Sequence, residues 1–409
     1  MENILFLIIV GIVVFDFFVE RLLDYLNTTR WSDQLPKQVA DVYEPSEYKK
    51  SQAYKKVNHQ FGMLTSAFSF VLILLMLFVD GFALVDSWVS VVSSHFIVVS
   101  LLFFAIIGFA SEILTLPFDV YDTFVIEERF GFNKTTVKTY IFDKIKSLLL
   151  AAVLGGAVLA LIMWLWKISG SYFWLIAWGV VTVISLFFTM FYSNLIVPLF
   201  NKQKPLDDGE LKTAIQNFAQ MAGFKLQNIY VIDGSKRSTK ANAYFTGIGP
   251  KKRIVLYDTL INDLTTDEIV AVLAHEIGHY KRKHTISSLA MGIIQTGIML
   301  FLFSLFIDSE VLSGALGVSE AKFHIGLVAF GILFTPFSFF TGILMNIISR
   351  KNEYEADNFA KSYGFEKQLI SALKKLTSSN LSNLTPHPLY VFFHYSHPTL
   401  LQRIVNLLP

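Results

Sequence analysis

The sequence has no cysteine among its 409 residues, which excludes disulfides and thiolate chemistry. Charged residues are also scarce, at 16% of the chain against 53% for apolar residues. This composition does not fit a soluble enzyme and indicates a chain that spends much of its length in lipid. The formal net charge is only +2, and no basic patch interleaved with aromatic residues occurs, so nucleic acid is not an expected partner.

Seven apolar runs are predicted to cross a bilayer as helices. The first follows Glu2 rather than Lys or Arg, and no small-residue cleavage site comes after it. We therefore interpret it as a retained span and not as a signal peptide. The spans are expected at residues 4–18, 61–85, 96–116, 147–166, 172–197, 286–307 and 323–348.

Lys and Arg are distributed unevenly between these runs. They are frequent after the first, third and fifth runs, whereas residues 85–94 contain Asp86 and no Lys or Arg. Because cytoplasmic loops carry the excess of Lys and Arg, we expect the amino terminus outside the cytoplasm and the carboxyl terminus inside it. The segment Pro117–Lys146, dense in charged and aromatic residues, is interpreted as a cytoplasmic loop.

The sixth run is preceded by the motif His-Glu-x-x-His at residues 275–279, which reads as part of one helix. His275 and His279 lie one turn apart on the same helical face, so both imidazoles can bind one ion. A zinc ion at such a site lowers the pKa of its bound water, and a carboxylate that is not a ligand can take the proton. Glu276 is the candidate base. The alternative is a capped surface helix that carries two histidines.

A catalytic zinc ion needs three protein ligands and one open position. Glu353 and Asp357 follow the last span one helical turn apart, so one can bind the ion while the other hydrogen-bonds a ligand histidine. Glu355 is expected to point elsewhere on that helix. Because one motif comes just before the sixth span and the other just after the seventh, antiparallel helices can bring them together at the cytoplasmic face. The alternative is a charged helix face with no metal.

The polar segment between the fifth and sixth spans has its own pattern. An amphipathic helix is expected at 211–222, a short strand at 228–232, and a hairpin with strands 241–245 and 253–257 joined by the glycine-rich residues 246–250. An edge strand beside a metal can pair with an extended peptide. The hairpin could equally be scaffold.

Near the end of the chain, His397 precedes a proline, and Arg403 lies two turns into a predicted helix. A cation or a hydrogen-bond donor is needed where negative charge develops on a substrate oxygen, and these side chains could provide it. A histidine at a helix start is also often only structural.

These features predict a mainly α, polytopic membrane protein with about seven transmembrane helices and a zinc-peptidase domain that contains a small β-hairpin or sheet. Residues 1–198 form the first five spans with their cytoplasmic loops, and residues 286–348 form the last two spans. Residues 199–285 and 349–409 form the two parts of the zinc-peptidase domain.

Further motifs extend over most of the chain: residues 123–134, 198–202 with 205–206, 234–238 leading to 242–245, 275–279, 352–357, and 396–398 with Arg403. Together they resemble the type I CAAX prenyl proteases. These are integral-membrane zinc metalloendopeptidases whose seven spans surround a large intramembrane chamber. The family removes the last three residues from farnesylated or geranylgeranylated proteins. The resemblance therefore implies a peptide or protein substrate, such as a prenylated CAAX protein, that is bound at the bilayer.

The resemblance also implies residue roles. One zinc ion per chain would be bound by His275, His279 and Glu353, with Glu276 as the base and Asp357 hydrogen-bonded to a ligand. His397 and Arg403 would lie near the reaction centre, and the substrate-binding edge would comprise Asn242, Ala243, Tyr244 and Phe245.

Two differences favour a bacterial member of that family. Lys240 stands where eukaryotic members carry a histidine, and the chain stops soon after Arg403 without a retrieval tail. The expected location is the bacterial inner membrane, or otherwise the endoplasmic reticulum, with the catalytic site on the cytoplasmic side.

Three alternatives remain at this level. A quality-control protease would apply the same chemistry to broader, non-prenylated substrates. A channel or transporter would also have several spans, but few ionisable residues interrupt the apolar runs. A zinc-binding scaffold without turnover would not need Glu276. No oligomer is implied.

Overall fold

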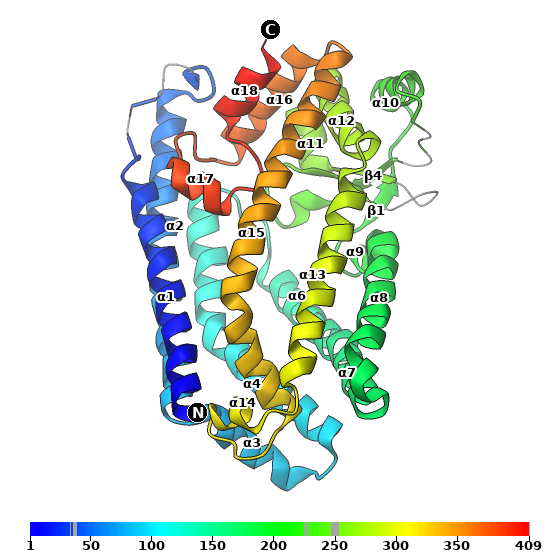
Figure 1. Ribbon diagram of the computed structural model, residues 1–409. Helices are drawn as coiled ribbons and strands as arrows, with labels where there is room; N and C mark the ends of the chain where they lie inside the picture. The colour runs from blue at the N-terminus through cyan, green and yellow to red at the C-terminus, as the bar shows by residue number, and fades with distance from the viewer. Residues whose placement is uncertain (33, 36–38, 225, 227–228, 247–252, 409) are drawn as a thin grey trace.

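The computed structural model describes the chain except for residues 33, 36–38, 225, 227–228, 247–252 and 409, and it describes only the backbone of Phe245 and Thr246. Long helices run along one direction, and a small sheet with several shorter helices lies at one end (Figure 1). The amino terminus lies at the end opposite the sheet, and the carboxyl terminus lies at the sheet end (Figure 1).

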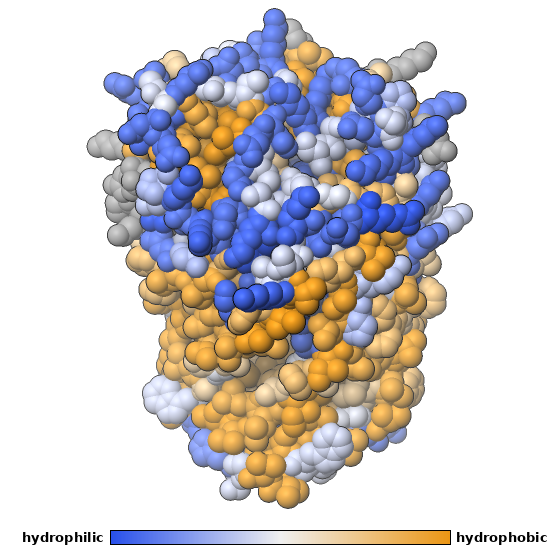
Figure 2. All heavy atoms as spheres, turned by 180° about the vertical axis from the view of Figure 1, so that it is seen from behind, coloured by the Kyte–Doolittle hydropathy of each residue, from blue (hydrophilic) through white to orange (hydrophobic). Residues whose placement is uncertain are grey.

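The long helices form the membrane region. In the described residues, six helical stretches are long and apolar enough to cross a membrane. One of them, residues 137–200, turns back at Gly170, where φ is 52°, so that two of its helices pack side by side and supply two of the predicted crossings. About seven crossings are therefore confirmed, and Figure 2 shows a broad apolar band below a hydrophilic end.

The helices of these crossings are α1 (Glu2–Thr28), α2 (Pro45–Phe78), α4 (Phe96–Tyr121), α6 (Val137–Leu150) with the π-helical turn η3 (Ala151–Gly155) and α7 (Gly156–Ser169), α8 (Phe173–Leu195), α13 (His284–Phe306) and α15 (Phe323–Ser362).

The second predicted span is too long at its end. Helix α2 stops at Phe78, Asp80 adopts a left-handed conformation with φ 50°, and the separate helix α3 (Gly81–Val92) then packs against α2 and α4. The predicted span extended past the end of α2 because α3 is itself apolar. Hydropathy alone does not detect that the backbone changes direction there.

The loop predicted for Pro117–Lys146 is largely helical. Helix α4 continues through the π-helical η2 (Asp122–Glu127) into α5 (Glu128–Phe130), and α6 begins at Val137. The charged groups here pair across helices: Lys144 Nζ lies 2.7 Å from Glu112 Oε1 and 2.5 Å from Asp119 Oδ2. These charges therefore do not mark a break in the helix.

A buried polar cluster holds the end opposite the sheet. His324 Nε2 lies 2.9 Å from Asp86 Oδ1, and His324 Nδ1 lies 2.9 Å from Ser100 Oγ. Lys322 Nζ donates to Asp86 Oδ2 at 2.7 Å. Because these partners come from α3, α4 and the start of α15, the cluster connects three segments at this end.

The sheet has four strands in the order β1-β2-β4-β3. The strands β2 and β4 are parallel, and the other neighbours are antiparallel. The predicted strand at 228–232 and the hairpin strands are confirmed, whereas Asn228 and residues 247–250 of the predicted connection lie outside the described residues. The sequence did not indicate β1, which has three residues and ends in a proline. The bounds are β1 (Gln203–Pro205), β2 (Ile229–Ile232), β3 (Ala243–Thr246) and β4 (Arg253–Tyr257).

Short helices cover the sheet and share one hydrophobic core with it. This core combines residues from before α13, such as Ile215 and Leu256, with residues from after α15, such as Leu369 and Leu407. The predicted amphipathic helix is confirmed as α10, and Gly223 follows it with φ 57°. The shorter helices at this end are α9 (Val197–Phe200), α10 (Glu210–Met221), η5 (Gly234–Lys236), α11 (Asp258–Asp263), α12 (Thr266–Lys281), α16 (Glu366–Ser379), α17 (Pro388–His394) and α18 (Leu400–Leu407). Helix α14 (Glu310–Gly314) lies at the opposite end, where it packs against α1 and α15 (Figure 1).

Candidate metal centre

Helix α12 carries the His-Glu-x-x-His motif and has a strong start. The side chain of Thr265 accepts a hydrogen bond from the backbone N–H of Glu268, and Glu268 Oε2 accepts one from the backbone N–H of Thr265 at 2.8 Å. This reciprocal capping box satisfies two backbone donors that would otherwise be unpaired.

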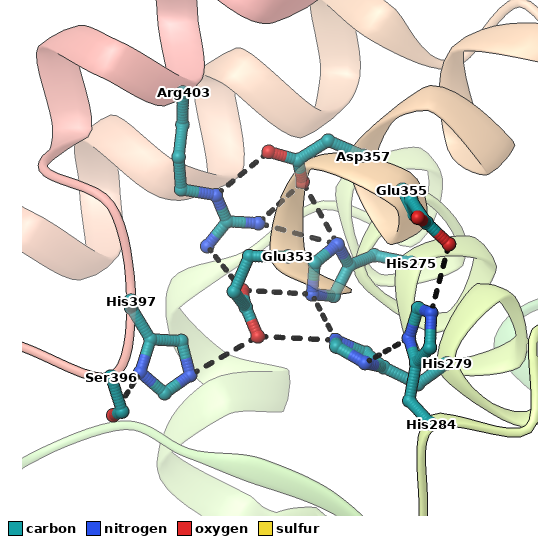
Figure 3. A network of polar contacts seen from close by, with 9 residues as sticks. All are labelled: His275, His279, His284, Glu353, Glu355, Asp357, Ser396, His397 and Arg403. Atoms are coloured by element: carbon teal, nitrogen blue, oxygen red, sulfur yellow. Dashed lines mark hydrogen bonds and ion pairs between the residues drawn. The ribbon is translucent and has the colours of Figure 1, made fainter. Parts of the chain in front are cut away.

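A close crossing of α12 and α15 brings the two motifs together. A Cβ atom added at Gly278 would lie 3.0 Å from Ala356 Cα and 3.0 Å from Phe359 Cβ. The close approach of α12 to α15 therefore requires a residue without a side chain at Gly278. The crossing places His275 and His279 beside Glu353 (Figure 3).

The donor atoms of these three side chains form a compact triangle. His275 Nε2 and His279 Nε2 are 3.1 Å apart, His279 Nε2 lies 3.2 Å from Glu353 Oε1, and His275 Nε2 lies 3.4 Å from Glu353 Oε2. Two donors about 2.0–2.1 Å from a tetrahedral zinc ion lie about 3.3–3.4 Å apart. The triangle therefore fits the predicted ligand set, and the three residues form a group able to hold a metal ion.

Glu353 supplies a second sign of fit. Its side chain is only 5% exposed, and its Oε2 atom has no hydrogen-bond partner among the described residues. A buried carboxylate oxygen that forms no hydrogen bond is costly, and the ion-pair contacts of this atom with His275 and Arg403 are long, at 3.4 Å and 3.6 Å. A divalent cation would satisfy it, and two imidazoles and a carboxylate are donors that zinc accepts.

His275 is held from its other ring nitrogen. His275 Nδ1 lies 2.8 Å from Asp357 Oδ1, and Asp357 in turn accepts two hydrogen bonds from Arg403, at 2.9 Å and 2.5 Å. Burial and Arg403 lower the pKa of His275, but hydrogen bonds to Asp357 and Glu353 outweigh them and raise it to about 9. The local field therefore favours a positive charge at this point, which also favours a cation.

His397 and Arg403 both reach Glu353 but differ in exposure. His397 Nε2 lies 3.3 Å from Glu353 Oε1, and its side chain is 63% exposed. Arg403 lies 3.6 Å from Glu353 Oε2 and is 11% exposed. His397 therefore stands on the open side of the cluster, whereas Arg403 is enclosed by it (Figure 3).

A further pair of residues at the centre was not predicted. His284 Nδ1 lies 3.0 Å from His279 Nδ1, and His284 Nε2 lies 3.2 Å from Glu355 Oε2 (Figure 3). Glu355 does point away from the metal triangle, as expected, but toward His284. The turn at Lys283, with φ 61°, brings His284 back against α12. A third histidine just after the motif was the available signal, but its spacing is not a helical repeat.

Glu276 lies on α12, close to the edge strand β3. Together with Ala243 and Tyr244 it lines a small cavity. In the described part of the chain, the Glu276 carboxylate has no hydrogen bond or ion pair. Asn242 is exposed, and its side-chain oxygen accepts a hydrogen bond from the backbone N–H of Ala243 at 2.8 Å. The Phe245 side chain lies outside the described residues.

This fold and this donor set define an integral-membrane zinc metallopeptidase. The model of the CAAX prenyl protease N-terminal region with five membrane helices matches residues 24–202, and that of peptidase family M48 matches residues 205–408. The chain is 36% identical to CAAX prenyl protease 1 of Saccharomyces cerevisiae, over 98% of this chain and 94% of the relative. It is 36% identical to the CAAX prenyl protease 1 homolog of Arabidopsis thaliana, over 97% and 96%.

The crystal structure of S. mikatae Ste24p is similar to this fold, with a TM-score of 0.92 and 35% identity. The similarity covers 98% of this chain and 99% of that chain. The protein therefore belongs to the CAAX prenyl protease 1 family of M48 zinc metallopeptidases. The resemblance found in the sequence is confirmed.

Proposed function

We propose that this zinc endopeptidase cleaves prenylated proteins near their carboxyl terminus, with Glu276 as the general base. The observation that carries the proposal is the position of Glu276. It follows a ligand histidine on α12, makes no contact that would occupy its carboxylate among the described residues, and shares a cavity with β3. A carboxylate at this place can take a proton from the attacking water.

A zinc ion held by His275, His279 and Glu353 would supply a Lewis acid and an acidified water. The role proposed for Asp357 is to hold the His275 ring through Nδ1, so that Nε2 faces the ion. Fixing the orientation of the ring in this way reduces the free-energy cost of forming the metal site.

His397 and Arg403 receive different proposed roles. His397 is the exposed member, so its Nε2 can donate a hydrogen bond to a substrate oxygen on which negative charge develops. The guanidinium of Arg403 forms ion pairs with Asp357 and Glu353, and the side chain is too buried to contact a substrate. We propose that Arg403 is a positioning residue.

The proposed substrate strand is β3. It stands at the edge of the sheet and borders the cavity that Glu276 lines. An extended peptide can add to such an edge by main-chain hydrogen bonds, which hold its scissile carbonyl at a fixed position relative to the metal site. Asn242, Ala243, Tyr244 and Phe245 would form this docking edge.

The loose packing of the spans supports an interior chamber. No side chain of α6 is buried, and in α1 only Ile9 and Leu23 are buried. Helices packed on one side against protein and on the other against lipid would bury one face. The small number of buried side chains in these two helices supports an internal space that could receive an apolar, lipid-modified peptide.

The proposed orientation places the metal centre on the cytoplasmic side. The excess of Lys and Arg in the segments after the first, third and fifth predicted spans supports it. The proposed membrane is the bacterial inner membrane or, alternatively, the endoplasmic reticulum.

The test compares zinc-loaded wild type with Glu276→Gln on a prenylated and an unmodified peptide of the same sequence. Wild type should cleave the prenylated peptide preferentially. The variant should lose activity by about 10²-fold or more while it keeps one zinc ion per chain. An unchanged rate in Glu276→Gln would refute the assigned base, and equal cleavage of the two peptides would instead support broad quality-control proteolysis.

A further inference from the structure

Near the edge strand β3 lies a second cavity, of about 630 Å³, that the chemistry above does not use. Lys240, three residues before β3, lines it on one side. Tyr395, two residues before His397, lines it on another. The cavity therefore extends between the segment that leads into the docking edge and the segment that carries His397. Its volume is within the range of sites for small ligands.

The charges in this cavity are not balanced. Three cations line it, and Asp24 is the one carboxylate among its described lining residues. Arg21 pairs with Asp24 at 2.9 Å, and Lys240 pairs with a carboxylate outside the lining at 2.8 Å. Lys55 Nζ contacts only a neutral partner, the side-chain oxygen of Asn383 at 2.9 Å, and forms no ion pair among the described residues. The cavity therefore favours an anionic ligand at Lys55.

Lys240 has capacity for a further contact. Its ammonium donates to Glu127 Oε2 at 2.8 Å and to the Tyr54 hydroxyl at 3.1 Å. An ammonium group has three N–H donors, so one remains. The side chain is also held over the Phe132 ring, at 4.4 Å from its centroid. Lys240 is therefore a fixed donor in the wall of the cavity.

The chain next to Lys240 closes one end of the docking edge. Thr239 donates its backbone N–H to the carbonyl of Phe132 at 3.1 Å, and Ser238 forms an antiparallel bridge with Asn133. A peptide that extends along β3 toward Lys240 meets this occupied segment. The terminus of a peptide that lies along β3 can therefore rest against this closed end.

The length of the edge matches a short terminal segment. The scissile bond would lie near Ala243, which borders the Glu276 cavity. Lys240 lies three positions before Ala243 in the chain, which is about 10 Å of extended chain at about 3.3 Å per residue. If the peptide pairs antiparallel to β3, its carboxyl end points toward Lys240. About three substrate residues then fit between the reaction centre and the cationic cavity.

We propose that this cavity binds the free carboxylate at the end of a peptide substrate, with Lys55 as its main cation and Lys240 as a second donor. Binding the chain end there selects the bond that lies about three residues upstream. This inference rests on the proposed function and specifies how that site recognises its substrate.

The test uses the full-length protein and one prenylated peptide made with a carboxyl-terminal acid or amide. Wild type should cleave the acid with a kcat/KM about 10-fold or more above that of the amide, because a hydrogen bond to a charged group contributes that much. In Lys55→Gln the value for the acid should fall about 10-fold, mainly through KM, and the value for the amide should not change. Lys56→Gln, at the exposed neighbouring position, is the matched control and should behave as wild type.

Equal cleavage of acid and amide by wild type would overturn the carboxylate subsite, as would a Lys55→Gln variant that loses both activities in parallel. A separate arm measures binding of an apolar tripeptide, as acid and as amide, to the Glu276→Gln protein. Preferred binding of the acid that is lost in Lys55→Gln supports the subsite even if no peptide is hydrolysed, whereas zinc-dependent hydrolysis without this preference supports the proposed function alone.

Discussion

At the scale of single residues, the hydrogen bonds of His279 determine the protonation of a whole chain of groups. A metal-binding Nε2 carries no proton, so the proton of a neutral His279 is on Nδ1 and points at His284 Nδ1, 3.0 Å away. His284 must then accept at Nδ1 and donate from Nε2 to Glu355, 3.2 Å away. This series of hydrogen bonds holds the second ring nitrogen of His279, as the contact with Asp357 holds that of His275.

We therefore expect His284→Gln and Glu355→Gln to weaken zinc affinity by about 10–100-fold, the usual effect of removing a partner that orients a ligand. Competition titration against a chelator would measure the affinity, and the absorption spectrum of the cobalt-substituted protein would report the change in ligand geometry. Asn358→Ala is the control, because Asn358 is exposed on the same helix and its side chain contacts Asn406 rather than Glu355. Unchanged affinity in both variants would exclude an orienting role.

At the scale of elements, the crossing of α12 and α15 determines whether the ligands meet. Gly278→Ala would place a Cβ atom 3.0 Å from Ala356 Cα and 3.0 Å from Phe359 Cβ. Although alanine favours a helix, overpacking should dominate and cost about 1–3 kcal/mol. We expect a lower thermal midpoint in detergent together with reduced zinc content.

Gly292→Ala provides the comparison for this crossing. Gly292 lies in α13, and its added Cβ would meet no atom within 4 Å. That variant should keep its zinc and its midpoint. If the two variants behaved alike, the close approach at Gly278 would not be what limits the crossing.

The start of α12 predicts a dependence of stability on pH. Burial raises the pKa of Glu268, but hydrogen bonds from Lys375, Ser371 and the backbone of Thr265 outweigh it and lower the pKa below its ordinary value. Because the folded-state pKa is the lower one, this contribution to stability is complete above the unfolded-state pKa. It is lost as the pH falls through the folded-state pKa.

Glu268→Gln should therefore be less stable than wild type at neutral pH, and the difference should shrink as the solution is acidified below about pH 4.5. Thermal unfolding in detergent at a series of pH values would show this. Asp267→Asn, at an exposed position in the same first turn, should give a smaller and flatter difference. A constant gap between Glu268→Gln and wild type at every pH would contradict the argument.

The elements also show which features could be predicted. Ligand residues on one helix have fixed spacing, so His275, His279 and the Glu353–Asp357 pair could be found from the sequence. The order of spans then placed the two helices together. His284 could not be assigned, because its position depends on a left-handed turn at Lys283 that no local pattern indicates.

Strand β1 and the helical residues 122–130 were missed for related reasons. A three-residue strand shows no periodicity, and the charges of the helical segment are satisfied by groups distant in the sequence. Glu127 is an example, because it binds Lys240.

At the scale of the whole molecule, a metal ion would connect α12 to α15 and so join parts of the chain on either side of two spans. An ion that binds only the folded state stabilises it by mass action. Removal of zinc by a chelator should lower the thermal midpoint, and added zinc should restore it in a concentration-dependent way. Glu353→Gln should show a much smaller response, and an equal response in that variant would indicate that the ion binds elsewhere.

The division of one hydrophobic core between residues before α13 and residues after α15 has a consequence during synthesis. A growing polypeptide that has not yet completed its last passage through the bilayer possesses the two imidazoles but neither the carboxylate ligand nor Arg403. The set of metal ligands is therefore incomplete until the segment after the last span has been synthesised and has packed against the earlier one.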